Sequence, residues 1–235
     1  MTNFVHFNLT GVDAEKFLQG QLTANVSKLN DQFLPTAISN LKGRVDFGLW
    51  IKKVGEQSFN IVIAQDLADR FAKHIKKYGA FSKMTLSDAE PIFTVVENGK
   101  PTFSQSAEKN DANWEKLSIE QGNYWITTAT QGLFQPQELR LHQRGGVDYD
   151  KGCYLGQEII ARLWFKASPK AWLHHVHLSA ETTSNDKIQI INQLQTDSGF
   201  DALVVARPED LQHPGIDLLD LPSELQQPVS RANHS

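Results

Sequence analysis

The stretch Lys151-Gly152-Cys153-Tyr154-Leu155-Gly156-Gln157-Glu158 carries the only cysteine of this 235-residue chain, between two glycines and close to a lysine. Because glycine adopts backbone conformations that other residues resist, Gly152 and Gly156 allow a sharp bend and a close approach to the main chain. Lys151 is suited to stabilise a thiolate on Cys153, and the thiolate is the reactive form. An apolar run follows and needs burial. The stretch predicts a polar turn that leads into the core, with a cysteine that is either reactive or a buried, inert thiol.

The composition is that of an ordinary globular protein, with 40% hydrophobic and 21% charged residues. A formal net charge of −4 gives no global basic field that would draw the chain onto nucleic acid. A single cysteine cannot form an internal disulfide, which fits a reducing compartment. The N-terminus does not read as a secretory signal, and no apolar segment approaches the roughly 20 residues that cross a bilayer. We expect a cytoplasmic protein with no membrane segment.

The spacing of apolar residues predicts two helices in the first third of the chain. The first covers residues 10–22. The second follows Asp66, which is expected to cap it. Its apolar stripe consists of Leu67, Phe71, Ile75 and Tyr78. The opposite face carries Lys73, Lys76 and Lys77, a run that favours a solvated helix face over a nucleic-acid site.

Alternating and β-branched segments predict most of the remaining elements as strands. The expected strands are residues 33–39, 45–51, 58–64, 83–87, 92–97, 124–129, 171–178, 187–191 and 202–205. A short helix is expected at 114–120, and the polar stretch 97–112 indicates turns or a weak boundary. The last 25 or so residues are expected to be loosely ordered. Without regular βαβ alternation, the pattern favours an α+β fold with a mainly antiparallel sheet.

Two separated regions of the chain match one known family. The first is Gly11–Val26, and the second combines Pro136–Leu139, Gly145-Gly146-Val147 and the 151–158 run. Lys42-Gly43-Arg44, between two predicted strands, fits the same pattern. Together these segments resemble the folate-binding YgfZ family, whose members are relatives of the aminomethyltransferase (T protein) of the glycine cleavage system. The resemblance covers about residues 4–175.

The resemblance implies ferredoxin-like lobes of the T-protein type around a central folate pocket, followed by a small β-barrel. Residues 1–164 would form the folate-binding domain, in two lobes with the weak boundary near 97–112. Residues 165–235 would form a short C-terminal β domain, truncated because about 70 residues are too few for a complete barrel. The implied role is assembly or repair of iron–sulfur clusters, which indirectly supports tRNA modification. The implied partners are folate and iron–sulfur client enzymes or assembly proteins, and direct tRNA binding is not expected.

One departure from the family's enzyme branch bears on catalysis. The resemblance places Phe47 and Gly48 near the aspartate with which the T protein assists chemistry at the folate. Asp46 is close, but neighbouring strand residues face opposite sides, so a one-residue offset points it away. Without that carboxylate the obvious general base is missing. The fold is therefore expected to be aminomethyltransferase-like without active aminomethyl transfer, and a tetrahydrofolate-dependent aminomethyltransferase or demethylase is the alternative.

A folate site needs aromatic or apolar walls, a few polar groups and a cation for the glutamate tail. The candidate contacts are Phe4, Gln21, Asn25, Lys42, Arg44 and Trp114. The two aromatic residues are either pterin neighbours or core side chains. The two amides either hydrogen-bond the pterin edge or cap and face solvent. The two cations either pair with the glutamate tail or belong to an ordinary hairpin turn.

The functional group of the opening stretch is Cys153, supported by Lys151 and Glu158. It is a nucleophile or persulfide carrier, a ligand to a transient cluster, or a structural thiol, since a cluster held by this chain alone would need several thiolates. Other residues are expected to support the motif: Gly152, Tyr154, Gly156, Gln157 and Arg162. The cluster His174, His175 and His177 lacks a completing carboxylate, so no metal site is expected.

Overall fold

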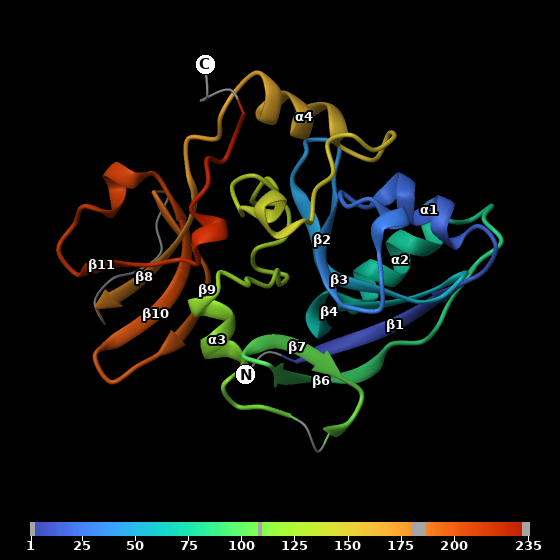
Figure 1. Ribbon diagram of the computed structural model, residues 1–235, viewed down its shortest axis with the longest axis horizontal. Helices are drawn as coiled ribbons and strands as arrows, with labels where there is room; N and C mark the ends of the chain where they lie inside the picture. Colours follow the sequence, from blue (N-terminus) through green and yellow to red (C-terminus); the bar gives the residue numbers. More distant parts are fainter. Residues whose placement is uncertain (1–2, 108–109, 180–186, 232–235) are drawn as a thin grey trace.

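A computed structural model describes residues 3–107, 110–179 and 187–231. Its larger sheet is antiparallel and has β1 (Phe4–Thr10) near its centre (Figure 1). In spatial order the strands are β2 (Leu34–Ser39), β3 (Val45–Gly55), β4 (Ser58–Ala64), β1, β6 (Glu90–Glu97) and β7 (Lys100–Ser104), with β5 (Thr85–Leu86) paired to β1. The predicted α+β class with a mainly antiparallel sheet is confirmed.

Helices α1 (Ala14–Gln21) and α2 (Ala68–Tyr78) cover one face of this sheet (Figure 1). Phe7 of β1 and Phe47 of β3 both pack their rings against Phe71 of α2, at 5.3 and 5.6 Å between centroids. The expected cap of α2 is wrong. Asp66 instead accepts a hydrogen bond from the Thr128 main-chain N–H at 2.8 Å, so it ties the helix entry to a distant loop.

The polar stretch 97–112, expected to hold turns or a boundary, also contains strand β7. Asn98 and Gly99 adopt φ of 52° and 73° and form the two-residue turn between β6 and β7. Two consecutive positive φ angles match the right-handed twist of the flanking strands, which is why Asn-Gly joins hairpins. The polar composition of this stretch therefore marks a hairpin that extends the sheet.

A second, four-stranded antiparallel sheet follows in the chain (Figure 1). Its spatial order is β11 (Ile216–Leu219), β8 (Trp172–Ser179), β10 (Gly199–Ala206) and β9 (Ile188–Gln195). One face, with Leu203 and Val205, belongs to the same hydrophobic core as the larger sheet, whereas Val176 and Val204 form a smaller core on the other face. The division of the chain at 164/165 stays a prediction.

The tail that was expected to be loosely ordered is packed as far as the structure describes it. Residues 216–219 form β11, and Leu225 and Val229 are buried. Arg231 donates its main-chain N–H to Trp164 O at 3.0 Å. Residues 232–235 lie outside the described part of the chain. Proline and glutamine content misled the prediction because the buried leucines and valines here are spaced irregularly.

In the part of the chain that the structure describes, the segments between the sheets include the short helices α3 (Trp114–Glu120), η4 (Leu141–Arg144) and α4 (Gln157–Phe165). The predicted helix at 114–120 is confirmed, but the strand expected at 124–129 is absent. Trp125 donates its N–H to the Asn192 side chain at 2.9 Å, and its carbonyl accepts from the same amide at 3.0 Å. A buried side chain thus satisfies the backbone groups that a neighbouring strand would otherwise pair. In the described residues, no helix is long and apolar enough to cross a membrane.

We predict that Asn192→Leu destabilises the fold by about 2–4 kcal/mol, because it leaves the Trp125 N–H and C=O buried without partners. Gln193→Leu, on the exposed next residue of β9, should change stability by less than about 0.5 kcal/mol. Urea unfolding of both variants measures the difference. Equal stabilities would show that the amide bridge between β9 and residue 125 contributes nothing.

Candidate functional site

Lys151 is buried and joins the cysteine turn to the end of α1. Its ammonium Nζ donates to the main-chain oxygens of Gln19, Leu22 and Ala24 at 2.7, 2.7 and 2.9 Å. Burial lowers the pKa of Lys151 to about 8, so the side chain is charged at neutral pH. Each of its three protons has a carbonyl acceptor, which leaves none for a thiolate at Cys153. This group of three carbonyls is called the lysine cage below.

The cysteine turn is exposed at its tip and tightly packed at its base. Cys153 is exposed, and space is open around Gly152. Gly156 has φ +79°, and a Cβ atom there would lie 2.4 Å from the main-chain oxygen of Asn40. Gly43, in the turn between β2 and β3, has a positive φ as well, and its added Cβ would lie 2.9 Å from Ile159. Two backbone turns therefore meet at glycines, and the thiol projects from a fixed base.

The other motif residues have distinct environments. Glu158 is exposed in the first turn of α4, where a negative charge favours the helix dipole. Tyr154 is buried with its ring 4.9 Å from the Lys151 ammonium. Gln157 donates its main-chain N–H to Tyr154 O at 3.2 Å. Arg162 is exposed, and its guanidinium makes no hydrogen bond to the turn within the described residues.

Phe4 and Trp114, the two aromatic folate candidates, lie together in a buried aromatic cluster. Their ring centroids are 5.1 Å apart, and both contact Trp50 and Phe103. Trp114 is 1% exposed, and its indole N–H donates to Thr102 O at 2.9 Å. The sequence reading missed Trp50 and Phe103, although an aromatic residue in each flanking strand was the available signal. Trp50 is the member of this cluster that lines a wider groove.

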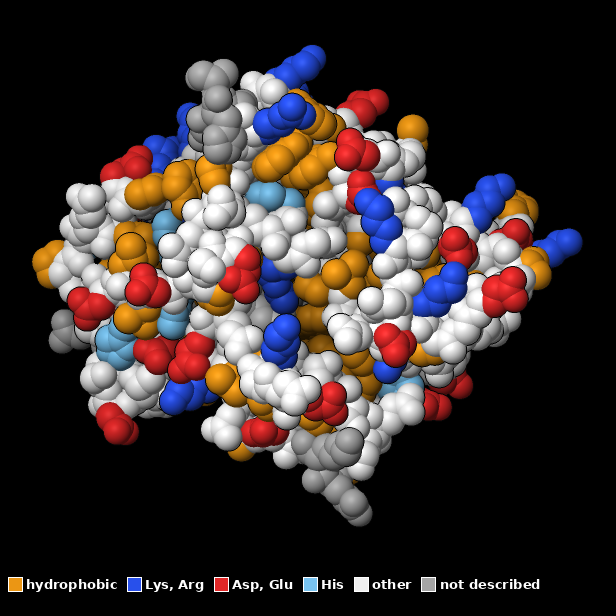
Figure 2. Space-filling view, viewed as in Figure 1, with side chains coloured by type: hydrophobic (Ala, Val, Ile, Leu, Met, Phe, Trp, Pro, Cys, Tyr) orange, Lys and Arg blue, Asp and Glu red, His pale blue; other side chains and the backbone are white. Residues whose placement is uncertain are grey.

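That groove has a volume of about 610 Å³ and lies between β2, β3 and β7 on one side and η4 and η6 (Ser223–Leu225) on the other. Its lining combines aromatic, proline and cationic side chains: Phe33, Trp50, Pro35, Pro101, Lys100 and Arg144. Figure 2 shows hydrophobic and basic side chains side by side in the hollow at the middle of the molecule. An aromatic wall facing cations suits a flat ligand with an anionic tail.

Arg144 is the cation of this groove whose side chain is fixed by other residues. Its guanidinium donates to the Asn123 side chain and lies 5.5 Å from the Tyr124 ring. Burial lowers the pKa of Arg144 to about 10, which leaves it charged at neutral pH. Lys100 is exposed on the opposite rim. The sequence analysis missed both cations: Lys100 lies outside the quoted segments, and Arg144 directly precedes Gly145-Gly146 without being part of the quoted pattern.

The remaining folate candidates lie away from this groove. The Gln21 side-chain oxygen accepts a hydrogen bond from His74 Nε2 at 2.8 Å, and Asn25 caps the turn that begins at Val26. Lys42 and Arg44 are exposed in the turn between β2 and β3, and Asn40 accepts hydrogen bonds from both of their main-chain N–H groups. This turn stands at the opposite end of the hairpin from Phe33, about 23 Å along the strand. The structure does not bring these four side chains together with Phe4 and Trp114.

Asp46 lies on the same face of β3 as Trp50 and opposite Phe47. Its carboxylate accepts a hydrogen bond from the Asn40 amide at 2.9 Å, and burial raises its pKa. Trp50 stands four positions further along β3. Asp46 therefore belongs to the β2–β3 turn and not to the lining of the groove.

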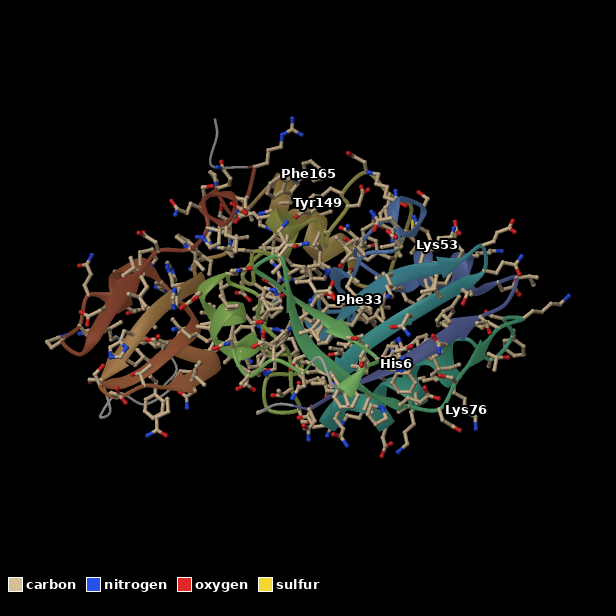
Figure 3. All side chains as sticks on the ribbon, turned by 60° about the horizontal axis from the view of Figure 1, so that its bottom comes forward. His6, Phe33, Lys53, Lys76, Tyr149 and Phe165 are labelled. Carbon is tan, nitrogen blue, oxygen red and sulfur yellow. The ribbon has the colours of Figure 1, made fainter. Side chains whose placement is uncertain are left out.

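Aromatic side chains also gather where α4 ends. Tyr149 and Trp164 stack with centroids 4.7 Å apart and planes 8° apart, and Phe165 meets the Tyr149 ring edge-on. Figure 3 shows Tyr149 and Phe165 near each other at the periphery and Phe33 closer to the centre. The three aromatic side chains at the end of α4 line a surface hollow of about 500 Å³ together with Lys28, Asp148 and Arg231, separate from the wall formed by Phe33 and Trp50.

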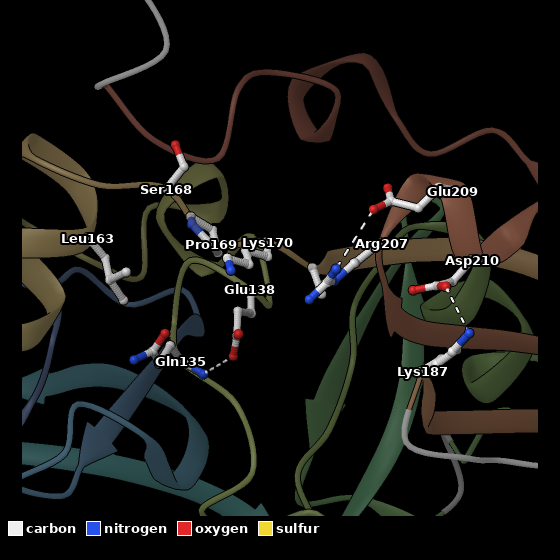
Figure 4. Close-up of a pocket in the computed structure, with 11 residues that line it drawn as sticks. Gln135, Glu138, Leu163, Ser168, Pro169, Lys170, Lys187, Arg207, Glu209 and Asp210 are labelled. Atoms are coloured by element: carbon white, nitrogen blue, oxygen red, sulfur yellow. Dashed lines mark hydrogen bonds and ion pairs between the residues drawn. The ribbon is translucent and has the colours of Figure 1, made fainter.

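A second cleft, of about 640 Å³, separates α4 from the smaller sheet (Figure 4). Oppositely charged residues on its right-hand wall pair with one another, Lys187 with Asp210 at 3.9 Å and Arg207 with Glu209 at 4.0 Å. Its lining contains no aromatic side chain. This cleft is less suited to a pterin than the central groove.

The three histidines of β8 lie in different environments and do not share a common partner. His177 Nδ1 lies 2.7 Å from Asp201 Oδ1, and His175 Nδ1 lies 3.4 Å from Asp220 O. Burial lowers the pKa of His174, on the other face, to about 4, so it is neutral at pH 7. Among the residues described, no group of three metal-binding side chains comes together.

Comparison with known proteins defines first a fold class and then a family. The chain is similar in fold to the glycine cleavage system aminomethyltransferase T from Bartonella henselae, with a TM-score of 0.63 over 94% of this chain and 84% of that one, at 11% identity. It is also similar in sequence to the tRNA-modifying protein YgfZ of Escherichia coli O157:H7 and of Shigella dysenteriae serotype 1. Each is 30% identical over 70% of this chain and 67% of the relative. The chain belongs to the YgfZ family. No protein-family model matches it.

We predict that Gly156→Ala destabilises the protein by about 1–3 kcal/mol, because alanine resists the positive φ and its Cβ would clash with the Asn40 carbonyl. Gly152→Ala is the matched control. It has open space and no positive φ, so its stability should stay within about 0.5 kcal/mol of the wild type. Thermal and urea unfolding distinguish the two. A Gly156→Ala protein as stable as Gly152→Ala would mean that the two turns do not need their close contact.

Proposed function

We propose that this chain is a cytoplasmic, folate-binding accessory protein of iron–sulfur cluster assembly or repair, which indirectly supports tRNA modification. Membership of the YgfZ family supports this role, since the relatives at 30% identity are named tRNA-modifying proteins. The observation that carries the folate part is the central groove, where an aromatic wall faces two cations. Folate combines a flat pterin with an anionic glutamate tail, and the groove offers a surface for each.

Within this proposal the pterin lies against Phe33 and Trp50, and the glutamate tail pairs with Lys100 and Arg144. Phe33 is only partly buried, so part of its surface is open to a ligand. Arg144 is held by Asn123, which reduces the entropy lost when it binds a carboxylate. Phe4 and Trp114 support the pterin wall through Trp50, which both contact, because neither lines the groove itself.

The second part of the proposal is that Cys153 presents a thiol to an iron–sulfur client or assembly protein. The exposed tip of the turn and its rigid base support this, because a fixed thiol loses little entropy when a partner engages it. On this proposal Lys151 supports Cys153 by holding the base of the turn in place, and Glu158 supports it by stabilising the first turn of α4. Several thiolates normally hold a cluster, so the remaining ligands come from the partner.

A tetrahydrofolate-dependent aminomethyltransferase or demethylase is the alternative. It would need a carboxylate close to the pterin to move a proton. Asp46 is bonded to Asn40 away from the groove, and Glu224, the carboxylate in the lining, is exposed at the rim. Both placements support a binding role over turnover.

Calorimetry with tetrahydrofolate and folinic acid tests the groove. Phe33→Ala should weaken binding by roughly fivefold or more through lost aromatic contact, and Lys100→Gln by roughly two- to fivefold through a lost surface ion pair. Lys116→Gln removes the same charge from α3, outside the groove, and should bind like the wild type. Trp114→Ala is a poor probe, since emptying a fully buried site costs about 3–5 kcal/mol of stability. Failure of the wild type to bind either folate would contradict the proposal. Turnover of a methylamine donor would favour the aminomethyltransferase or demethylase alternative.

Replacing the chromosomal copy with Cys153→Ala tests the thiol. Activity of cluster-dependent enzymes in the cells should fall several-fold, while the melting temperature of the purified variant stays within about 2 °C of the wild type, because the residue is exposed. Cys153→Ser should behave like the alanine variant, since a hydroxyl does not replace a thiolate ligand or nucleophile. Normal enzyme activities in Cys153→Ala cells, or an unfolded variant, would show that the cysteine has no such role.

A further inference from the structure

A basic surface lies on the outside of α2, in a chain whose net charge is −4. From position 70 to position 83 the sequence has five basic residues and no acidic one. They are Arg70, Lys73, Lys76, Lys77 and Lys83, and they are called the basic ridge below. All five are exposed. A local excess of this size is independent of the negative total, because charges farther than about 10 Å away are largely screened at physiological salt.

Four of the five residues of the basic ridge lie on α2, and Lys83 stands in the segment between α2 and β5. Arg70, Lys73 and Lys77 stand three and four residues apart, so they share a face and span about 10 Å along the axis. Within the described residues none of the five forms an ion pair with a carboxylate. Arg70 donates to the side-chain oxygen of Gln131, which orients its guanidinium without neutralising it. The charges of the ridge are therefore available to a polyanion.

Two aromatic side chains are exposed where the ridge ends. Phe81 is 103% exposed and Tyr78 is 46% exposed. The Lys77 ammonium lies 5.2 Å from the centre of the Tyr78 ring. A single exposed aromatic residue is unremarkable, but two that are three residues apart beside a row of cations match the way proteins bind unpaired bases. The sequence pattern alone favoured a solvated face, because a lysine run on a helix is usually solvated, and it placed Tyr78 on the apolar stripe.

The apolar side of α2 is buried, which distinguishes α2 from a helix that binds a membrane surface. Phe71 and Ile75 are 0% and 3% exposed and pack into the core, whereas an interfacial helix offers its apolar face to the bilayer. The groove lies on the other face of the larger sheet, since Phe47 contacts Phe71 and Trp50 does not. Figure 3 shows Lys76 at the outer edge of the molecule.

We propose that the basic ridge, with Tyr78 and Phe81, binds a single-stranded segment of RNA. The phosphates lie along the lysines and Arg70, and bases stack on the two aromatic rings. RNA fits better than an acidic protein because bases can stack on the exposed ring of Phe81 and on the face of Tyr78 that does not pack against His74, whose ring centroid is 4.5 Å away. It fits better than duplex nucleic acid because the bases must be unpaired.

Fluorescence anisotropy with a labelled 12-nucleotide RNA lacking self-complementarity tests the proposal on the full chain at 50 and 200 mM KCl. The triple variant Lys73→Gln/Lys76→Gln/Lys77→Gln should bind roughly tenfold or more weakly at the lower salt, and its salt slope should be smaller by about 2. Phe81→Ala should bind roughly tenfold more weakly through lost stacking. The control Lys116→Gln/Lys166→Gln/Lys170→Gln changes the net charge equally at exposed lysines off α2 and should bind within about twofold of the wild type. Circular dichroism melting verifies that all variants fold.

Four outcomes would overturn the proposal. They are no binding by the wild type, equal losses in the two triple variants, unchanged affinity in Phe81→Ala, and binding to phosphatidylserine vesicles with no anisotropy change on RNA. The second would mean attraction by overall charge, the third a polyanion site without stacking, and the fourth a membrane surface. Because the groove plays no part in this assay, folate binding and RNA binding succeed or fail separately.

Discussion

A single buried ammonium group fixes the relation between the two regions that carry the family resemblance. Helix α1 ends with main-chain carbonyls that have no partner within the helix, and such groups are costly to bury unpaired. Lys151, about 130 positions later, supplies three protons to the carbonyls of the lysine cage. Thr23 adds a second link, since its hydroxyl donates to Gly146 O at 2.6 Å. A glutamine would not reproduce the cage, because it carries only two side-chain protons and no charge.

The lysine cage explains why a lysine lies close in sequence to a cysteine whose thiolate it does not stabilise. From the sequence alone, a lysine two residues from a cysteine suggests thiolate stabilisation, and that reading is reasonable chemistry. In the structure the lysine points into the protein and the cysteine points out. Residues two positions apart in a regular extended segment face the same side, so the turn departs from that geometry between Lys151 and Cys153, where Gly152 stands. The motif is thus a structural unit with one projecting group, the Cys153 thiol.

Sequence patterns predicted the parts of the fold that local physics determines. The strand at 58–64 and the helix at 114–120 have the predicted limits, because alternation and helical spacing there are clear and the ends carry turn residues. The failures have long-range causes. Asn192 satisfies the backbone of Trp125 from 67 positions away, which removes the need for a strand, and the Asp66 carboxylate is used by Thr128. The site was harder still, since Arg144, Lys100 and Phe33 line one groove from three separate segments whose proximity no spacing rule reveals.

The larger sheet gives the molecule two chemically different sides, and the two-residue period of its strands is the cause. On β3, Trp50 faces the groove while Phe47 faces α2. On β1, Phe4 joins the aromatic cluster while Phe7 packs against Phe71. A shift of one residue in register would exchange these side chains, so groove and helical layer are specified by the same pairing. The helical layer then carries the basic ridge outward on α2, and the groove stays on the opposite side. A ligand in the groove and a polyanion on α2 would therefore occupy separate surfaces of one rigid sheet, and each could be bound without displacing the other.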